Sequence, residues 1–126
     1  MEFIKESLND GEIIKIYIGK EISKSGEGVS GSIELDIENQ AYFIEIIASM
    51  FDEGINKVII DMKNIAYIDS SGLWALFEGH KKAVQQEAIL ILLSPSKDVK
   101  RVLDITKMSS KMKVYESEKE AIQALS

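Results

Sequence analysis

The chain has 126 residues, of which 45% are hydrophobic and 29% are charged, and its net charge at pH 7 is −6. This is the composition of an ordinary globular protein, and the length suits one domain over residues 1–126. The acidic balance argues against direct binding to nucleic acid or to an anionic membrane, and with no cysteine and one histidine we expect no disulfide, metal site or cofactor.

The N-terminal part predicts two strands and a helix. Alternating isoleucines after a turn signal at residues 9–11 predict a strand over 12–19, and a second short strand is predicted over 32–36. The segment between them, residues 22–30, is rich in Ser and Gly and predicts the loop of a hairpin. Apolar residues at helical spacing then predict a helix over 39–51.

From there strands and helices alternate. Residues 58–60 are β-branched and predict a strand buried on both faces, and 65–68 form a second apolar run. Further strands are predicted over 88–93 and 112–115, and further helices over 73–86, 97–105 and 117–125. This order predicts an α/β fold with a mixed, mostly parallel sheet of about five strands, whose N-terminal hairpin adds an antiparallel edge. No leader or membrane-spanning stretch is seen, so a cytoplasmic protein is expected.

The helix predicted over 73–86 has an apolar stripe that we expect to be buried, formed by Leu73, Leu76, Phe77, His80 and Val84. His80 is therefore interpreted as a packed residue, and it lies about 15 Å along the helix from Ser70, too far for a Ser-His-Asp arrangement. Trp74 lies off the stripe and one turn from Ser70. It is either a partly buried core residue or an exposed anchor for a partner.

Residues 69–72, Asp-Ser-Ser-Gly, fall where a predicted strand gives way to this helix. Asp and Ser commonly cap helices, so plain capping is one interpretation. The free N–H groups of a helix start also favour an anion, and partners often meet an α/β sheet at this edge. A functional interpretation is therefore open as well.

Asp61 follows the apolar run 58–60, as the phosphoacceptor of a response-regulator receiver domain does. That chemistry also needs an acidic Mg²⁺-binding pair after the first strand, but Gly19, Lys20 and Glu21 stand there. The other interpretation of Asp61 is a turn residue at the end of a strand.

Residues 58–73, Val-Ile-Ile-Asp-Met-Lys-Asn-Ile-Ala-Tyr-Ile-Asp-Ser-Ser-Gly-Leu, resemble the signature of STAS domains, in particular the bacterial anti-sigma-factor antagonists. Residues 31–36, 94–103 and 118–125 resemble further segments of that family. The resemblance implies a single STAS domain, with four helices packed mainly on one side of the sheet.

It also implies a binding switch that is not an enzyme. In such proteins the Ser directly after the motif Asp, here Ser70, is phosphorylated by an anti-sigma factor with serine kinase activity and dephosphorylated by a serine phosphatase. The unphosphorylated form binds the anti-sigma factor and so regulates transcription indirectly. The partner-binding residues that the resemblance implies are Asp36, Asp69, Ser71, Gly72, Leu73 and Trp74.

Some features depart from the family or leave alternatives. Trp74 stands where the family usually has a small residue, and residues 22–30 look like an insertion. A STAS scaffold, or an accessory subunit of a larger signalling or transport complex without a phosphoswitch, is the alternative function. The chain is expected to be a monomer or a weak dimer.

Overall fold

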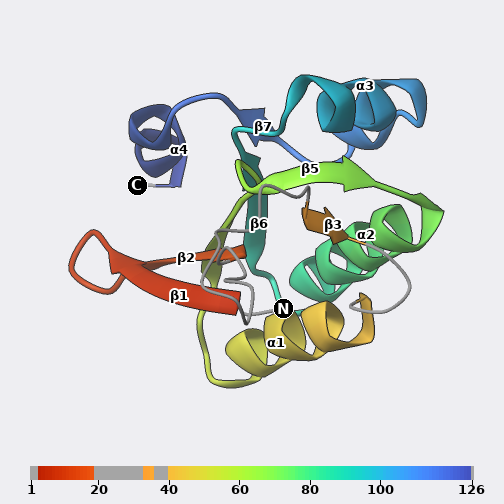
Figure 1. Cartoon of the computed structure of the whole chain (residues 1–126). Helices are drawn as coiled ribbons and strands as arrows, with labels where there is room; N and C mark the ends of the chain where they lie inside the picture. The colour runs from red at the N-terminus through yellow and green to blue at the C-terminus, as the bar shows by residue number, and fades with distance from the viewer. Residues whose placement is uncertain (1–2, 19–32, 36–39, 126) are drawn as a thin grey trace, which may run out of the picture.

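The computed structural model describes residues 3–18, 33–35 and 40–125 (Figure 1). The segment predicted as a loop over 22–30 and the candidate residue Asp36 lie outside the described residues. In chain order the elements are β1 (Phe3–Leu8), β2 (Ile13–Ile18), β3 (Ile33–Leu35), α1 (Gln40–Asp52), β4 (Lys57–Asp61), β5 (Ile65–Ile68), α2 (Ser70–Gln85), β6 (Ile89–Leu93), α3 (Lys97–Ile105), the 3₁₀ turn η1 (Met108–Ser110), β7 (Val114–Tyr115) and α4 (Glu118–Leu125).

The main sheet has five strands in the order β1-β2-β4-β6-β7. β1 and β2 are antiparallel, and every other neighbouring pair is parallel. The predicted α/β fold with a mixed, mostly parallel sheet is therefore confirmed. β3 and β5 pair in parallel as a separate two-stranded sheet, which the sequence did not predict.

The predicted hairpin between residues 12–19 and 32–36 is wrong. The antiparallel edge is formed by β1 and β2 across a turn in which Asn9, Asp10 and Gly11 all have positive φ. β3 instead pairs with β5. β1 was missed because three polar residues in a row, Lys5, Glu6 and Ser7, interrupt the apolar alternation of what is an exposed edge strand.

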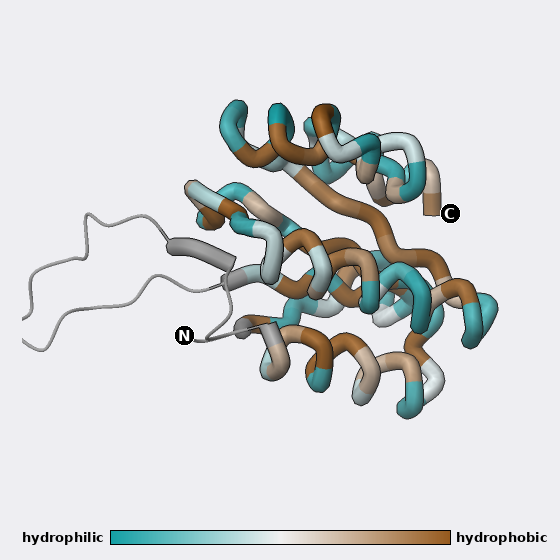
Figure 2. Tube along the Cα trace, turned by 90° about the vertical axis from the view of Figure 1, so that its right-hand side faces the viewer, coloured by the Kyte–Doolittle hydropathy of each residue, from teal (hydrophilic) through white to brown (hydrophobic). Residues whose placement is uncertain are grey.

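The two faces of the sheet carry two apolar clusters, because successive side chains of a strand point to opposite faces. Toward α1 and α2 point Ile16, Val58, Ile60, Leu90 and Leu92, whereas Ile13, Ile59, Ile91 and Leu93 point toward α4. α3 packs on β5, and its Val99 and Leu103 join the larger cluster. Most of the helical packing is thus on one side, with α4 on the other (Figures 1 and 2).

The buried face of α2 differs from the predicted one. Its buried residues are mostly small: Gly72, Ala75, Leu76, Gly79 and Ala83. A Cβ on Gly79 would lie 3.3 Å from Leu90 Cδ2 and 3.6 Å from Ile47 Cγ2, so the helix packs closely on its neighbours. Val84, which was predicted to be buried, is 63% exposed, and Leu73, Phe77 and His80 are half-buried. The helix packs through its small residues because they permit close approach to α1 and to the sheet.

Candidate functional site

The start of α2 is fixed by Asp69. Asp69 is the N-cap residue, and its backbone is extended. Its carboxylate Oδ1 accepts the N–H of Gly72 at 2.9 Å, and its carbonyl oxygen accepts the N–H of Leu73 at 3.0 Å. The capping interpretation of this segment is therefore confirmed, and the cap holds Ser70 as the first residue of the helix.

The side chains around this cap differ in their access to solvent. Asp69 and Ser70 are exposed, while Ser71 and Leu73 are half-buried. Gly72 is buried, and its N–H is bound by the Asp69 carboxylate. Residues 69–71 and 73 are thus all at least partly accessible to solvent at the helix start.

Exposed aromatic residues stand on both sides of Ser70 in the sequence. Trp74 is 51% exposed, which excludes the interpretation as a core residue, and its role as an anchor for a partner stays a prediction. Tyr67 of β5 is 54% exposed, and sequence reasoning did not single it out. Ala66 beside it is also exposed, and this break in the alternation of β5 is the feature that marks the strand as open to solvent.

The first turn of α2, residues 70–73, carries no acidic and no basic side chain. Within residues 3–18, 33–35 and 40–125, the charged group that accepts one of its N–H groups is the Asp69 carboxylate. An anion on Ser70 would gain from the helix dipole but would meet this carboxylate nearby. Adding or removing a negative charge on Ser70 would therefore change the electrostatic interactions at the start of α2.

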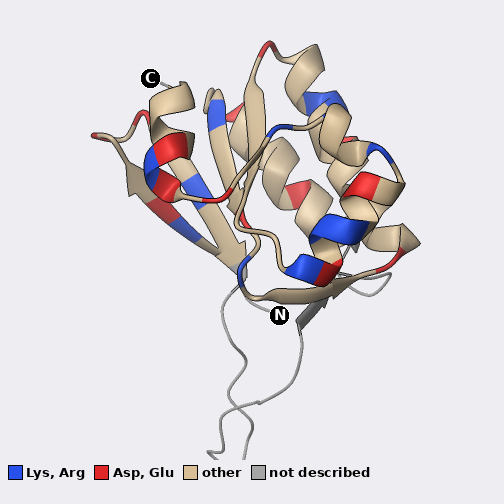
Figure 3. Ribbon diagram, turned by 90° about the horizontal axis from the view of Figure 1, so that it is seen from above, with Lys and Arg blue, Asp and Glu red and all other residues tan. Residues whose placement is uncertain are grey.

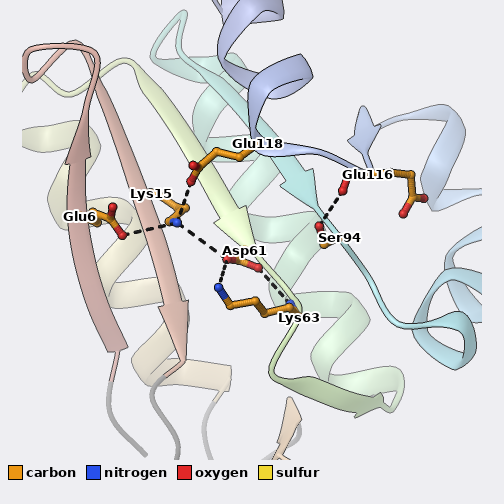
Figure 4. A network of polar contacts seen from close by, with 7 residues as sticks. All are labelled: Glu6, Lys15, Asp61, Lys63, Ser94, Glu116 and Glu118. Carbon is orange, nitrogen blue, oxygen red and sulfur yellow. Dashed lines mark hydrogen bonds and ion pairs between the residues drawn. The ribbon is translucent and has the colours of Figure 1, made fainter.

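A second polar cluster lies on the α4 face of the sheet, around Lys15 (Figure 4). The Lys15 side chain is 9% exposed, and its Nζ lies 2.7 Å from Glu118, 3.4 Å from Glu6 and 4.0 Å from Asp61. Burial by itself lowers the pKa of Lys15, but the hydrogen bonds and charges of Glu118 and Glu6 outweigh it, so the pKa is raised. Lys15 is therefore a fixed cation that joins three elements.

Asp61 is 3% exposed and ends β4. Its Oδ1 accepts the N–H of Lys63 at 3.0 Å, and its Oδ2 lies 3.3 Å from Lys63 Nζ. Asp61 thus shapes the turn between β4 and β5, in agreement with its interpretation as a turn residue at the end of a strand. No cluster of three His, Cys, Asp or Glu that could hold a metal occurs within residues 3–18, 33–35 and 40–125.

Comparison with known sequences assigns the chain to a protein family. The sequence profile of the STAS domain matches residues 29–121. The chain belongs to the STAS domain family. Among its relatives, the anti-sigma-B factor antagonist of Staphylococcus epidermidis is 36% identical over 84 residues, which cover 66% of this chain and 77% of the relative. The anti-sigma-B factor antagonist of Staphylococcus aureus is 32% identical over the same length and coverage.

Solved structures resemble this STAS domain over nearly its whole length. A candidate anti-sigma factor antagonist from Thermotoga maritima matches with a TM-score of 0.79 and 22% identity, covering 98% of this chain and 93% of that one. The anti-sigma factor antagonist SpoIIAA in its unphosphorylated form has a TM-score of 0.73 and 20% identity, with 98% and 96% covered. At these identities the likeness shows the fold alone.

The family assignment supports residues 69–74 as the candidate site and not Asp61. Residues 69–74 lie where β5 gives way to α2, as predicted, but the helix begins at Ser70 and not at residue 73. The receiver-domain interpretation of Asp61 has no support, because the fold is that of a STAS domain and the carboxylate is buried and bonded. Among the residues that the structure describes, no helix is long and apolar enough to cross a membrane.

Proposed function

We propose that this STAS domain is an anti-sigma-factor antagonist that acts as a phosphorylation-controlled binding switch in the cytoplasm and not as an enzyme. Unphosphorylated, it binds an anti-sigma factor with serine kinase activity and so regulates transcription indirectly. Phosphorylation of Ser70 releases it, and a serine phosphatase restores binding. The observation that carries the proposal is the exposed Ser70 at the capped start of α2, directly after Asp69.

The physical chemistry of phosphate supports this switch. A phosphoserine adds about −1.5 to −2 charges at neutral pH. At the start of α2 the helix dipole favours this charge, so the fold should be retained. In an interface beside the Asp69 carboxylate, the same charge would be repelled and would lose its hydration, so binding should be lost.

The proposed partner surface extends from Asp69 along the first turn of α2. Ser71 and Leu73 are half-buried and contribute part of their surface, and Gly72 contributes backbone. Trp74 is the large exposed side chain of this surface, and tryptophan is enriched among the residues that dominate binding energy. Asp36 is proposed to border the same surface.

The test combines phosphosite mapping with binding. The protein is incubated with ATP and the serine-kinase anti-sigma factor of its own genome, and Ser70→Ala is compared with Ser71→Ala, which removes the neighbouring hydroxyl. We expect one phosphate on Ser70 in the wild type and in Ser71→Ala, and none in Ser70→Ala. We also expect Ser70→Ala to stay bound to the partner when ATP is added, whereas the wild type dissociates.

Two other results would point elsewhere. A stable complex without any phosphate, in vitro and in the protein's own cells, would favour the scaffold or accessory subunit. A phosphate that survives in Ser70→Ala and is lost in mild base would be an acyl phosphate, and would return attention to Asp61.

A further inference from the structure

The charges of this acidic chain are unevenly distributed along the sequence. Residues 97–113 contain six lysines and arginines against two aspartates, whereas residues 25–56 contain seven acidic residues and no lysine or arginine. α3 and η1, from the basic segment, lie at one end of the molecule, and α1, from the acidic segment, lies at the opposite end (Figures 1 and 2). Figure 3 shows the α3 end from above, with basic positions in blue. In the part of the chain that the structure describes, residues 97–113 therefore carry a net positive charge at one end, and α1 carries two acidic and no basic side chains at the other.

The outer face of α3 combines positive charge with an exposed apolar residue. Lys97, Arg101 and Ile105 follow one another at intervals of four residues, and all three are exposed. Ile105 is 73% exposed, more than any other large hydrophobic residue of the described part of the chain. Asp104 shares this face, and within the described residues Lys97 and Arg101 form no ion pair.

The outer face of α1 has the complementary pattern. Tyr42, Glu45, Ser49 and Asp52 are exposed and recur at helical spacing, opposite the buried residues of the helix. Tyr42 is 50% exposed, and α1 contains no basic residue. At 1.5 Å per residue, Tyr42 to Asp52 spans about 15 Å and Lys97 to Ile105 about 12 Å, so the two faces match in length.

We propose that copies of this chain associate head to tail, with the outer face of α3 in one copy against the outer face of α1 in the next. An antiparallel arrangement of the two helices places Ile105 against Tyr42 and Arg101 against Glu45. Lys97 then lies beyond Arg101, on the side toward Asp52. The two faces differ, so the contact is heterologous: in an open chain one face stays free at each end, and in a ring no face stays free. The association forms a ring or an open chain.

This association is independent of the proposed phosphoswitch, because the start of α2 belongs to neither face. The association rests on exposed charges, and at about 0.1 M salt such charges are screened from one another beyond about 10 Å. We therefore expect the association to be weak and to depend on ionic strength. The apolar pair Ile105 and Tyr42 supplies the part of the contact that salt does not remove.

The test is sedimentation velocity of the whole chain over a range of concentrations, at low salt and at about 0.5 M salt. We expect species that grow with concentration at low salt and shrink at high salt. The variant Lys97→Glu/Arg101→Glu reverses the basic face, and Glu45→Lys/Asp52→Lys reverses the acidic face. Each alone should lower the association constant roughly tenfold or more, because it turns attraction into repulsion.

The decisive measurement is the mixture of the two variants. Their altered faces are complementary to each other, so mixing them should restore the large species that each variant has lost. Lys119→Glu, an exposed charge reversal on α4, is the control and should leave the association unchanged. A chain that stays monomeric at all concentrations and low salt would overturn the proposal and assign the two faces to other proteins. Association that survives both reversals, or a mixture that stays small, would overturn it as well.

Discussion

At the scale of single residues, Asp69 has two effects that can be separated. Its carboxylate satisfies the N–H of Gly72, which stabilises the start of α2. Its negative charge also lies next to the hydroxyl of Ser70, where we propose that phosphate is added. Asparagine can keep the first effect without the second, because its side-chain oxygen also caps helices.

We therefore expect Asp69→Ala to lower the free energy of unfolding by about 1 kcal/mol, and Asp69→Asn to lower it by only a few tenths. Urea denaturation followed by circular dichroism measures both. Ser96→Ala is the matched control, because Ser96 caps α3 through the N–H of Val99 at 3.2 Å and lies outside the candidate site. Equal losses for Asp69→Ala and Asp69→Asn would show that the charge, and not the cap, stabilises the fold.

Lys15 shows how little a strand pattern says about a buried charge. The sequence places Lys15 between two isoleucines of β2, where alternation predicts a polar, exposed position. In the structure the second face of the sheet is covered by α4, and Lys15 is 7% exposed and paired with carboxylates from three other elements. Glu6 faces Lys15 across the β1–β2 hairpin, but Asp61 and Glu118 are far away in sequence, so only the tertiary structure brings them to Lys15.

We expect Lys15→Met to lower the free energy of unfolding by about 3 kcal/mol at neutral pH, because it leaves the buried Asp61 with one cation fewer. The double variant Lys15→Met/Asp61→Asn should recover part of this loss, since it removes the unpaired charge too. A single variant as stable as the wild type would show that the cluster contributes nothing to stability.

The same comparison has a defined pH dependence. Because the pKa of Lys15 is raised in the folded state, its contribution is fully present below the pKa of the unfolded chain, about 10.4, and is lost as pH rises through the folded pKa. The difference between wild type and Lys15→Met should therefore be constant from pH 7 to about pH 9.5 and shrink above about pH 10.4. A difference that stays constant to pH 11 would contradict the assigned cause.

At the scale of elements, the buried face of a helix was predicted well where large side chains form the contact, and poorly where small ones do. α3 was predicted with its observed bounds, because Ser96 caps it and its large residues Val99 and Leu103 are the ones that pack. In α2 the large residues mark a face that only partly overlaps the buried one: Leu76 is buried as predicted, but the rest of the contact is formed by small residues such as Gly79 and Ala83, which contribute little hydrophobicity. Hydrophobic periodicity records burial of large side chains, not closeness of packing.

This difference can be measured within α2. Gly79→Val should lower the free energy of unfolding by about 2 kcal/mol or more, because its side chain must enter the contact with Leu90 and Ile47. Val84→Ala should change it by less than about 0.5 kcal/mol, because Val84 is 63% exposed. Thermal unfolding of both variants measures this. A large loss in Val84→Ala would restore the face predicted from the sequence.

At the scale of the whole molecule, the position of residues 69–74 could be predicted because they are continuous in sequence. Residues 69–74 form one cap and one helical turn, so their proximity needs no tertiary information. The pairing of β3 with β5, and the placement of α1 and α3 at opposite ends of the molecule, depend on how distant segments come together. These features could be described only from the structure.

Strands β4 and β6 couple the two apolar clusters, because each strand contributes residues to both. Ile59 belongs to the α4 cluster, whereas its neighbours Val58 and Ile60 belong to the larger one, and β6 alternates in the same way. β4 therefore cannot lose its contacts on one face without moving the residues of the other. A chain built in this way should unfold as one unit, as expected for a single domain of this length.

We accordingly expect Leu125→Ala in the α4 cluster and Leu103→Ala in the larger cluster to behave alike. Each deletes a buried leucine side chain and should cost about 3 kcal/mol. Each should also lower the unfolding midpoint without creating a second transition. Hydrogen exchange read at the amides of β4 and α1 should show the same loss of protection in both variants, because both elements open only with the whole fold. If Leu125→Ala lowered protection in α4 alone and left β4 and α1 unchanged, α4 would be a separate unit that can detach from a sheet that stays folded.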